Sequence, residues 1–126
     1  MKTGSCLCGA VKFTAAALGG VTACHCTQCR KQTGNYWSSM HVNEADFALT
    51  EQRGLKWYRS SPTAQRGFCS ECGSSLFWKA DGKNTISVTA GTIDGKTDSK
   101  LEGHIFCDDA GDYYEIAGGD YKLGQW

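Results

Sequence analysis

Three cysteines lie within one short stretch of the chain, "CHCTQC", which places Cys24, Cys26 and Cys29 close together. The C-x-C and C-x-x-C spacings allow all three sulfur atoms to reach a single metal ion. Three protein ligands leave one position of a tetrahedral zinc ion for water or substrate, which is typical of catalytic zinc sites. We therefore predict that these three cysteines, called the trio below, hold a catalytic zinc ion.

The expected chemistry of the trio follows from its ligand type. An all-thiolate shell is soft and electron-rich, so it favours a further thiolate over an ionised water. A thiol bound to zinc loses its proton and becomes a better nucleophile at neutral pH. The trio therefore predicts a small-molecule thiol as substrate. Polarisation of a carbonyl by the zinc ion is the other chemistry that such a site allows.

A fourth protein ligand would instead make the trio a second structural site. His25 is adjacent, but in an extended C-x-C segment its side chain points away from both neighbouring sulfurs. Cys107, His41 and His104 are the remaining candidates, and each would have to reach the trio through the fold. A closed site of this kind would indicate a non-catalytic zinc scaffold that binds a partner.

A second set of four cysteines comes from two distant segments, "SCLCG" and "FCSECG". Cys6 and Cys8 form one pair, Cys69 and Cys72 form the other, and each pair is followed by a glycine that accepts a positive φ at little cost. Two such pairs predict a structural tetrahedral zinc site. The bound ion would close a loop of about 60 residues, which constrains a small domain. We therefore predict two zinc ions per chain.

Disulfides are the alternative use of eight cysteines, which can pair in 105 ways. The segment "MKTGSCLCGAVKFTAAALGG" lacks the apolar run of about 7–15 residues of a signal peptide and the run of about 20 of a membrane span. We therefore expect a cytoplasmic protein that does not enter the membrane. In that compartment cysteine motifs bind metal or act in catalysis more often than they form disulfides.

Charged side chains near the cysteines offer two further candidate contacts. Arg30 and Lys31 follow the trio directly and are candidates for binding the carboxylates of an anionic thiol. They fit equally well as solvated cations at the end of a helical turn. Asp108, Asp109 and Asp112 are expected in a solvated loop, although one carboxylate is a candidate acid–base group.

The composition is that of one small domain, which we place at residues 1–126. Lysine plus arginine and aspartate plus glutamate each number 13, so the formal net charge is zero. This balance disfavours a nucleic-acid surface, which usually shows a basic excess. Repeats, linkers, phosphate-binding loops and nucleophile motifs are absent from the sequence. The oligomeric state is not indicated.

The segments that must position these cysteines are predicted to form short strands. Six runs rich in β-branched and aromatic residues alternate between apolar and polar positions, and they span residues 10–15, 35–42, 55–60, 75–80, 85–90 and 113–116. The only helical candidate is a short turn through "TQCRKQTG", which Gly34 ends. The sequence therefore predicts a mainly β fold with at most short helical turns.

At these residues the sequence resembles the glutathione-dependent formaldehyde-activating enzyme family, which includes centromere protein V-like proteins. The segments that carry the resemblance are "GSCLCGAVKF", "ACHCTQCRKQTG", "RGFCSECGSSLFW", "ISVTAGTID" and "EGHIF". The resemblance implies an Mss4-like, zinc-ribbon-type β-tent of several short antiparallel sheets. It also implies a structural zinc on the four cysteines and a catalytic zinc on the trio. The implied activity is that of a carbon–sulfur lyase that joins glutathione and formaldehyde to give S-hydroxymethylglutathione.

Overall fold

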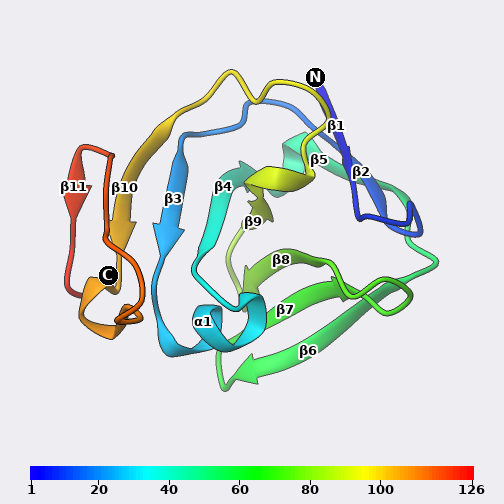
Figure 1. Ribbon diagram of the computed structural model, residues 1–126. Coiled ribbons are helices and arrows are strands. Elements are labelled where there is room, and N and C mark those ends of the chain that lie inside the picture. Colours follow the sequence, from blue (N-terminus) through cyan, green and yellow to red (C-terminus); the bar gives the residue numbers. More distant parts are fainter.

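The chain forms short strands linked by turns, as Figure 1 shows for a computed structural model that describes residues 1–126. The strands are β1 (Lys2–Ser5), β2 (Lys12–Ala15), β3 (Val21–Cys24), β4 (Trp37–Asn43), β5 (Phe47–Glu51), β6 (Leu55–Ser61), β7 (Ala64–Cys69), β8 (Ser75–Ala80), β9 (Thr85–Thr89), β10 (Leu101–Ile105) and β11 (Tyr121–Lys122). The helical elements are α1 (Thr27–Thr33) and the 3₁₀ turns η1 (Glu44–Asp46), η2 (Ala90–Thr92) and η3 (Cys107–Asp109).

The strands are arranged in two sheets. A three-stranded antiparallel sheet has the order β1-β2-β5, and an eight-stranded sheet has the order β11-β10-β3-β4-β9-β8-β7-β6. Within the larger sheet β10 lies parallel to both β3 and β11, whereas the other pairs are antiparallel. The predicted mainly β fold is confirmed. The parallel pairs place β10 beside β3 and β11 beside β10, at the left of Figure 1.

Most of the predicted elements occur where the alternation placed them. Five of the six predicted strands correspond to β2, β4, β6, β8 and β9 and agree within two residues at each end. The helical turn is α1, which ends at Gly34 with a φ of 85°. Glycine tolerates this left-handed conformation, so the helix stops where the sequence places the glycine.

The predicted strand at 113–116 is wrong, because this segment forms a turn and irregular backbone. Its tyrosines make contacts that a strand would not allow. The Tyr114 hydroxyl lies 2.6 Å from Nδ1 of His25, and the Tyr113 hydroxyl donates to the Gly34 carbonyl oxygen at 3.1 Å. Side chains on successive positions of a strand point to opposite faces. Here both rings turn towards the α1 end of the molecule instead.

One face of the larger sheet packs in the core and the other carries polar side chains. Alternation along β4 directs Met40 and Val42 into the main hydrophobic cluster. The intervening residues Trp37, Ser39 and His41 point to the opposite face. This opposite face of the sheet forms the floor of the cleft that is described below.

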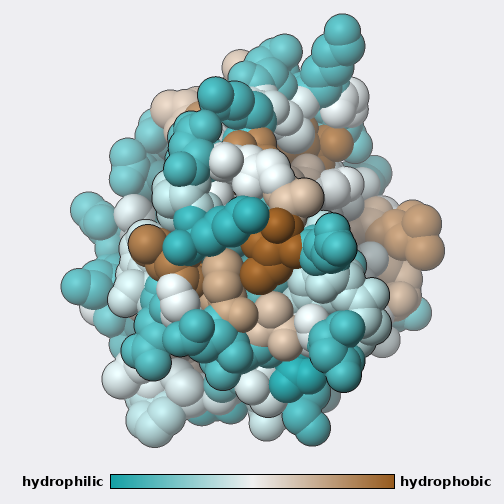
Figure 2. Space-filling view, turned by 60° about the vertical axis from the view of Figure 1, so that its left-hand side comes forward, coloured by the Kyte–Doolittle hydropathy of each residue, from teal (hydrophilic) through white to brown (hydrophobic).

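The surface shows small apolar groups among hydrophilic side chains. On the side that Figure 1 shows at the left, Figure 2 shows apolar atoms gathered in a few groups, each bordered by hydrophilic residues. The single α-helix has 7 residues, and no helix is long and apolar enough to cross a membrane.

Candidate metal centres and the adjoining cleft

The sulfur atoms of Cys6, Cys8, Cys69 and Cys72, called the four-cysteine site below, all lie within 4.8 Å of one another. The separations from Cys8 Sγ are 3.8 Å to Cys6 Sγ and 3.7 Å to Cys69 Sγ. A tetrahedral zinc ion with bonds of about 2.3 Å separates its sulfur ligands by about 3.8 Å. These two separations match those expected around a tetrahedral zinc ion, and all four sulfurs are close enough to share one ion.

Two local turns create this arrangement. Gly9 and Gly73, which follow the two cysteine pairs, have φ values of 82° and 81°. The Gly73 amide donates to the Cys69 carbonyl oxygen at 2.7 Å and closes its turn. The Val11 amide donates to Cys6 Sγ at 3.3 Å. The expectation that both trailing glycines adopt a positive φ is confirmed.

The four-cysteine site belongs partly to the hydrophobic core. Cys6 and Cys69 are buried and are members of the main cluster. A side chain on Gly54 would meet Cys69 Sγ at 2.8 Å, so this loop covers the site closely. On the outer side, hydrogen bonds from the Ser74 hydroxyl and amide lower the pKa of the Cys72 thiol to about 5. The site is therefore buried at Cys6 and Cys69, whereas Cys8 is exposed.

The trio is built at the junction of β3 and α1. Cys24 is the last residue of β3, Cys26 is the N-cap of α1, and Cys29 is a buried residue of the first helical turn. Their sulfur atoms lie within 4.8 Å of one another. Cys26 Sγ accepts a hydrogen bond from the Cys29 amide at 3.4 Å. The end of one strand and the first turn of one helix therefore bring together three sulfurs from a segment of six residues.

The thiols of the trio differ in acidity. Hydrogen bonds from Cys24 and then from Cys29 lower the pKa of the Cys26 thiol, and the positive charge of Arg66 acts in the same direction. The hydrogen bond with Cys26 is the main cause that raises the pKa of Cys24. The trio therefore carries negative charge on Cys26 first, at the positive end of the α1 backbone dipole.

Arg66 is a contact of the trio that the sequence analysis missed. This residue of β7 is only 6% exposed, and its Nη2 donates to Cys29 Sγ at 3.5 Å. Its Nε and Nη1 donate to the side-chain oxygens of Gln28 at 3.2 Å and Gln32 at 2.9 Å. Its guanidinium also lies 5.8 Å from the centre of the Trp37 ring. A buried cation therefore lies beside the trio, where it favours the thiolate form of its cysteines.

The trio has no fourth protein ligand within its cluster, which contains only its three cysteines. His25 lies between Cys24 and Cys26 in the sequence and is buried, but both of its ring nitrogens form hydrogen bonds with other residues. The Ala117 carbonyl accepts from His104 Nε2 at 3.0 Å, so His104 Nδ1 accepts from His25 Nε2 at 2.9 Å. His25 Nδ1 then accepts from the Tyr114 hydroxyl at 2.6 Å.

This chain of hydrogen bonds explains the buried histidines. Burial and then the neighbouring His104 lower the pKa of His25, which favours the neutral ring that the network requires. Burial raises the pKa of the Tyr114 hydroxyl, which keeps it a donor. The network therefore attaches the segment after η3 to the backbone of the trio. His41 and Cys107, the other candidate ligands, are likewise not members of the cluster.

A cleft of about 500 Å³ adjoins the trio on the polar face of the larger sheet. Its floor follows the strand register, because Cys24 pairs with Trp37 and Thr22 pairs with Ser39. Next to them, Ser87 pairs with both His41 and Trp78. The β6–β7 turn, α1 and the C-terminal segment supply the rim. The sulfurs of the trio thus face a cavity large enough for a small molecule.

The charged residues singled out in the sequence have different positions relative to this cleft. Arg30 and Lys31 lie in the last turn of α1 and are not among the lining residues. Asp109 lines the cleft, whereas Asp108 and Asp112 do not. The basic pair therefore does not face the space beside the trio, and one of the three aspartates does.

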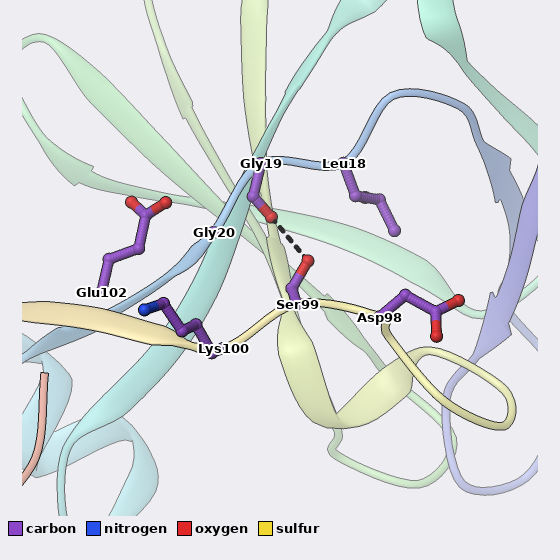
Figure 3. Close-up of a pocket in the computed structure, with 7 residues that line it drawn as sticks. All are labelled: Leu18, Gly19, Gly20, Asp98, Ser99, Lys100 and Glu102. Atoms are coloured by element: carbon purple, nitrogen blue, oxygen red, sulfur yellow. Dashed lines mark hydrogen bonds between the residues drawn. The ribbon is translucent and has the colours of Figure 1, made fainter.

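A second hollow lies on the surface between the Gly19–Gly20 turn and the segment before β10, as Figure 3 shows. The Ser99 hydroxyl donates to the Gly19 carbonyl oxygen at 3.0 Å and ties the two segments together. The hollow contains no thiol, histidine or aromatic ring, and Asp98 at its edge pairs with Lys2. The groups suited to metal binding lie in the two cysteine clusters, and only the trio faces the cleft.

The fold and these two sites together define a mainly β protein with two cysteine clusters able to bind metal, one of them beside a cleft. The sequence model of the glutathione-dependent formaldehyde-activating enzyme family matches residues 1–109 of the chain. The chain belongs to this family. The match includes all eight cysteines and ends before the C-terminal segment.

The chain is also similar to two individual proteins. An uncharacterised lyase of Schizosaccharomyces pombe is 28% identical over 116 residues, which are 90% of this chain and 84% of that protein. The crystal structure of a Rhodobacter sphaeroides protein has a TM-score of 0.64 and 22% identity, and the alignment covers 79% of this chain and 98% of that one. The first relative is named as a lyase, and the second shares the fold.

Proposed function

We propose that this protein is a zinc-dependent carbon–sulfur lyase that forms or cleaves a thiol–aldehyde adduct. The observation that carries the proposal is the position of the trio, whose three sulfurs face a cleft and have no fourth ligand from the chain. The family description suggests S-hydroxymethylglutathione, made from glutathione and formaldehyde, as the first adduct to test. The lyase name of the yeast relative agrees with this reaction class.

The reaction is an addition that needs no oxidant or reductant. The substrate sulfur forms a bond to the aldehyde carbon, the carbonyl π electrons move to oxygen, and the thiol proton is transferred to that oxygen. Zinc bound to the trio would favour the thiolate form of the substrate at neutral pH. In the reverse direction the carbon–sulfur bond breaks and the hydroxyl proton returns to sulfur.

The residues of the chain have three roles in this proposal. Arg66 lies against Cys29 and offsets the excess negative charge of three thiolates. The helical turn holds Cys26 and Cys29 in a fixed relation through the capping hydrogen bond. The hydroxyls of Ser39 and Ser87 on the floor are available to bind the hydroxyl of the adduct.

We further propose that the four-cysteine site holds a second zinc ion with a structural role. The spacing of its sulfurs fits tetrahedral coordination, four cysteines complete the shell, and Cys6 and Cys69 belong to the hydrophobic core. Metal binding at such a site contributes directly to folding free energy. The two proposed ions therefore have different tasks.

The test is the exchange rate between free glutathione, formaldehyde and their adduct, measured by magnetisation-transfer NMR with the zinc-loaded protein. We expect acceleration over the uncatalysed exchange, loss of the acceleration in Cys26→Ser, and no change in the control Cys107→Ser. The zinc content should be two per chain in the wild type and one in Cys26→Ser. Wild-type exchange at the uncatalysed rate with every thiol tried would contradict the proposed reaction.

A further inference from the structure

We infer that the thiol accepted by this cleft carries an uncharged, aromatic body rather than several free carboxylates. The inference rests on the proposed function, because it concerns the thiol that would bind beside the trio. It concerns substrate class, and it follows from the charges and rings that line the cleft. It departs from the dicarboxylate thiol named in the family description.

The first observation is that the cleft offers no free cation for carboxylates. Arg66 is the only lysine or arginine that lines the cleft; it is buried, and three of its five N–H groups already donate, to Gln28, Gln32 and Cys29. Recognition of a carboxylate in proteins usually uses an arginine fork or a lysine that faces the ligand. Arg30 and Lys31 do not line the cleft.

The second observation is the charge balance around the trio. Three thiolates and one divalent ion leave one negative charge, which Arg66 offsets. Asp109 on the rim then leaves the cleft slightly negative. A substrate thiolate adds another negative charge, and free carboxylates would add more in a half-enclosed space where screening is weak. An uncharged body avoids this repulsion.

The third observation is the concentration of rings around the cleft. Trp37, Trp78, Phe106 and Trp126 all contribute to its lining. Trp37 lies opposite Cys24 in the register, and Trp78 lies opposite Arg66, so two indoles stand near the trio. Trp126 is 76% exposed, which leaves its ring free to be covered by a ligand. Aromatic walls of this kind favour flat apolar groups.

The polar groups of the floor are uncharged and match the other half of the adduct. Ser39 and Ser87 are buried hydroxyls beneath the cleft, and Ser87 lies 3.4 Å from His41 Nδ1. A thiol–aldehyde adduct has one hydroxyl group, which can exchange hydrogen bonds with such side chains. The lining therefore offers hydrogen-bonding partners for the hydroxyl of the adduct and apolar surface for a ring.

The experiment compares three thiols with the cobalt-substituted full-length protein, whose thiolate-to-metal absorption reports binding without turnover. The thiols are phenylmethanethiol, glutathione, and glutathione diethyl ester, which removes both carboxylates at nearly constant size. We expect phenylmethanethiol to bind at least about tenfold more tightly than glutathione, with the ester between them. Glutathione binding as tightly as phenylmethanethiol would overturn the inference and leave the proposed reaction standing. No response to any thiol would overturn both.

Two variants test the physical cause. Thr63→Arg places an unengaged cation on the rim, and we expect it to raise glutathione affinity about fivefold without raising that of phenylmethanethiol. Gln52→Arg, an exposed position outside the lining, is the matched charge control. Trp78→Ala should lower the phenylmethanethiol-to-glutathione affinity ratio about tenfold. An unchanged ratio in both Thr63→Arg and Trp78→Ala would contradict the assigned substrate class.

Discussion

The two cysteine clusters use the same ligand type in opposite ways. In the four-cysteine site, Cys8 and Cys69 are 61 residues apart in sequence and their sulfurs are 3.7 Å apart in space. The trio takes all its sulfurs from residues 24–29, so a metal ion there closes only a short loop. A cross-link over about 60 residues removes about 4 kcal/mol of chain entropy from the unfolded state, and a short one removes less.

The two clusters also differ in their surroundings. The four-cysteine site has two members in the hydrophobic core and a glycine loop packed against it. The trio faces a cleft, and the buried Arg66 that contacts Cys29 lines the same cleft. A site with four cysteines from distant segments is suited to stabilising the fold. A site with three cysteines from one short segment beside a cleft is suited to binding a substrate.

The largest expected effect is the loss of the fold in Cys72→Ser. This change removes one of four converging thiols, so the proposed ion would lose affinity and the distant segments would separate. We expect destabilisation by about 5 kcal/mol or more, which is comparable to the whole stability of a small domain. Thermal unfolding followed by circular dichroism measures this effect. A cooperative transition near the wild-type temperature would contradict the structural role.

The contrasting change is Cys26→Ser in the trio. We expect loss of thiol–aldehyde exchange with a stability loss below about 2 kcal/mol, because serine is itself a favoured N-cap residue and α1 keeps its first turn. Zinc content and thermal unfolding on the same samples check both parts. If Cys26→Ser and Cys72→Ser unfolded to the same extent, the difference between the two clusters would be lost.

Arg66→Ala should have an intermediate effect that is confined to the trio. The substitution leaves the Gln28 and Gln32 side-chain oxygens without their buried donor and removes the cation beside Cys29. We expect the free energy of unfolding to fall by about 2–3 kcal/mol. We also expect the affinity of the trio for zinc to fall about 10- to 100-fold. Competition with a chromogenic chelator separates the two ions by affinity.

The control for this prediction is Arg59→Ala. Arg59 also pairs through its guanidinium, with Asp81 at 2.6 Å, but both side chains are about half exposed. Exposed pairs of this kind contribute about 0–1 kcal/mol. Equal effects of Arg59→Ala and Arg66→Ala on the zinc of the trio would show that Arg66 has no specific role there.

The smallest expected effect is Gly73→Ala in the turn of the four-cysteine site. A Cβ at this position meets nothing within 4 Å, so only the φ of 81° opposes the change. We expect a loss of about 1 kcal/mol from backbone strain. Gly91→Ala is the matched control, because its Cβ also meets nothing and its φ is not positive. Denaturant unfolding should resolve the two variants, and equal midpoints would refute the strain argument.

Much of the fold and of the metal chemistry was predictable from local patterns. The spacing of cysteines and the glycines after them determine short turns, so the grouping into four and three sulfurs followed from the sequence. Gly34 ended α1 as predicted, and alternation located five strands. The turns, the helix end and each short cysteine motif depend on residues within a few positions of one another, whereas the four-cysteine site also brings together Cys8 and Cys69, which are 61 residues apart. As zinc ligands, the seven cysteines remain a prediction.

The surroundings of the trio were not predictable in the same way. The basic residues that follow it in sequence, Arg30 and Lys31, do not face the cleft, whereas Arg66 reaches it from β7. The segment 113–116 has the alternation of a strand, yet Tyr114 binds His25 instead. No pattern within either segment contains this information.

The sequence alone indicated which cysteines are candidate metal ligands and where the chain turns, because ligand spacing within a motif and positive φ are local properties of the backbone. Tertiary structure decided which cation contacts the sulfurs, which aromatic rings line the cleft and which hydrogen bond attaches the C-terminal segment to His25. These outcomes depend on strand register, which sets residues of neighbouring strands opposite each other, and on the parallel pairing of β3 with β10, which places Leu101 beside Val21.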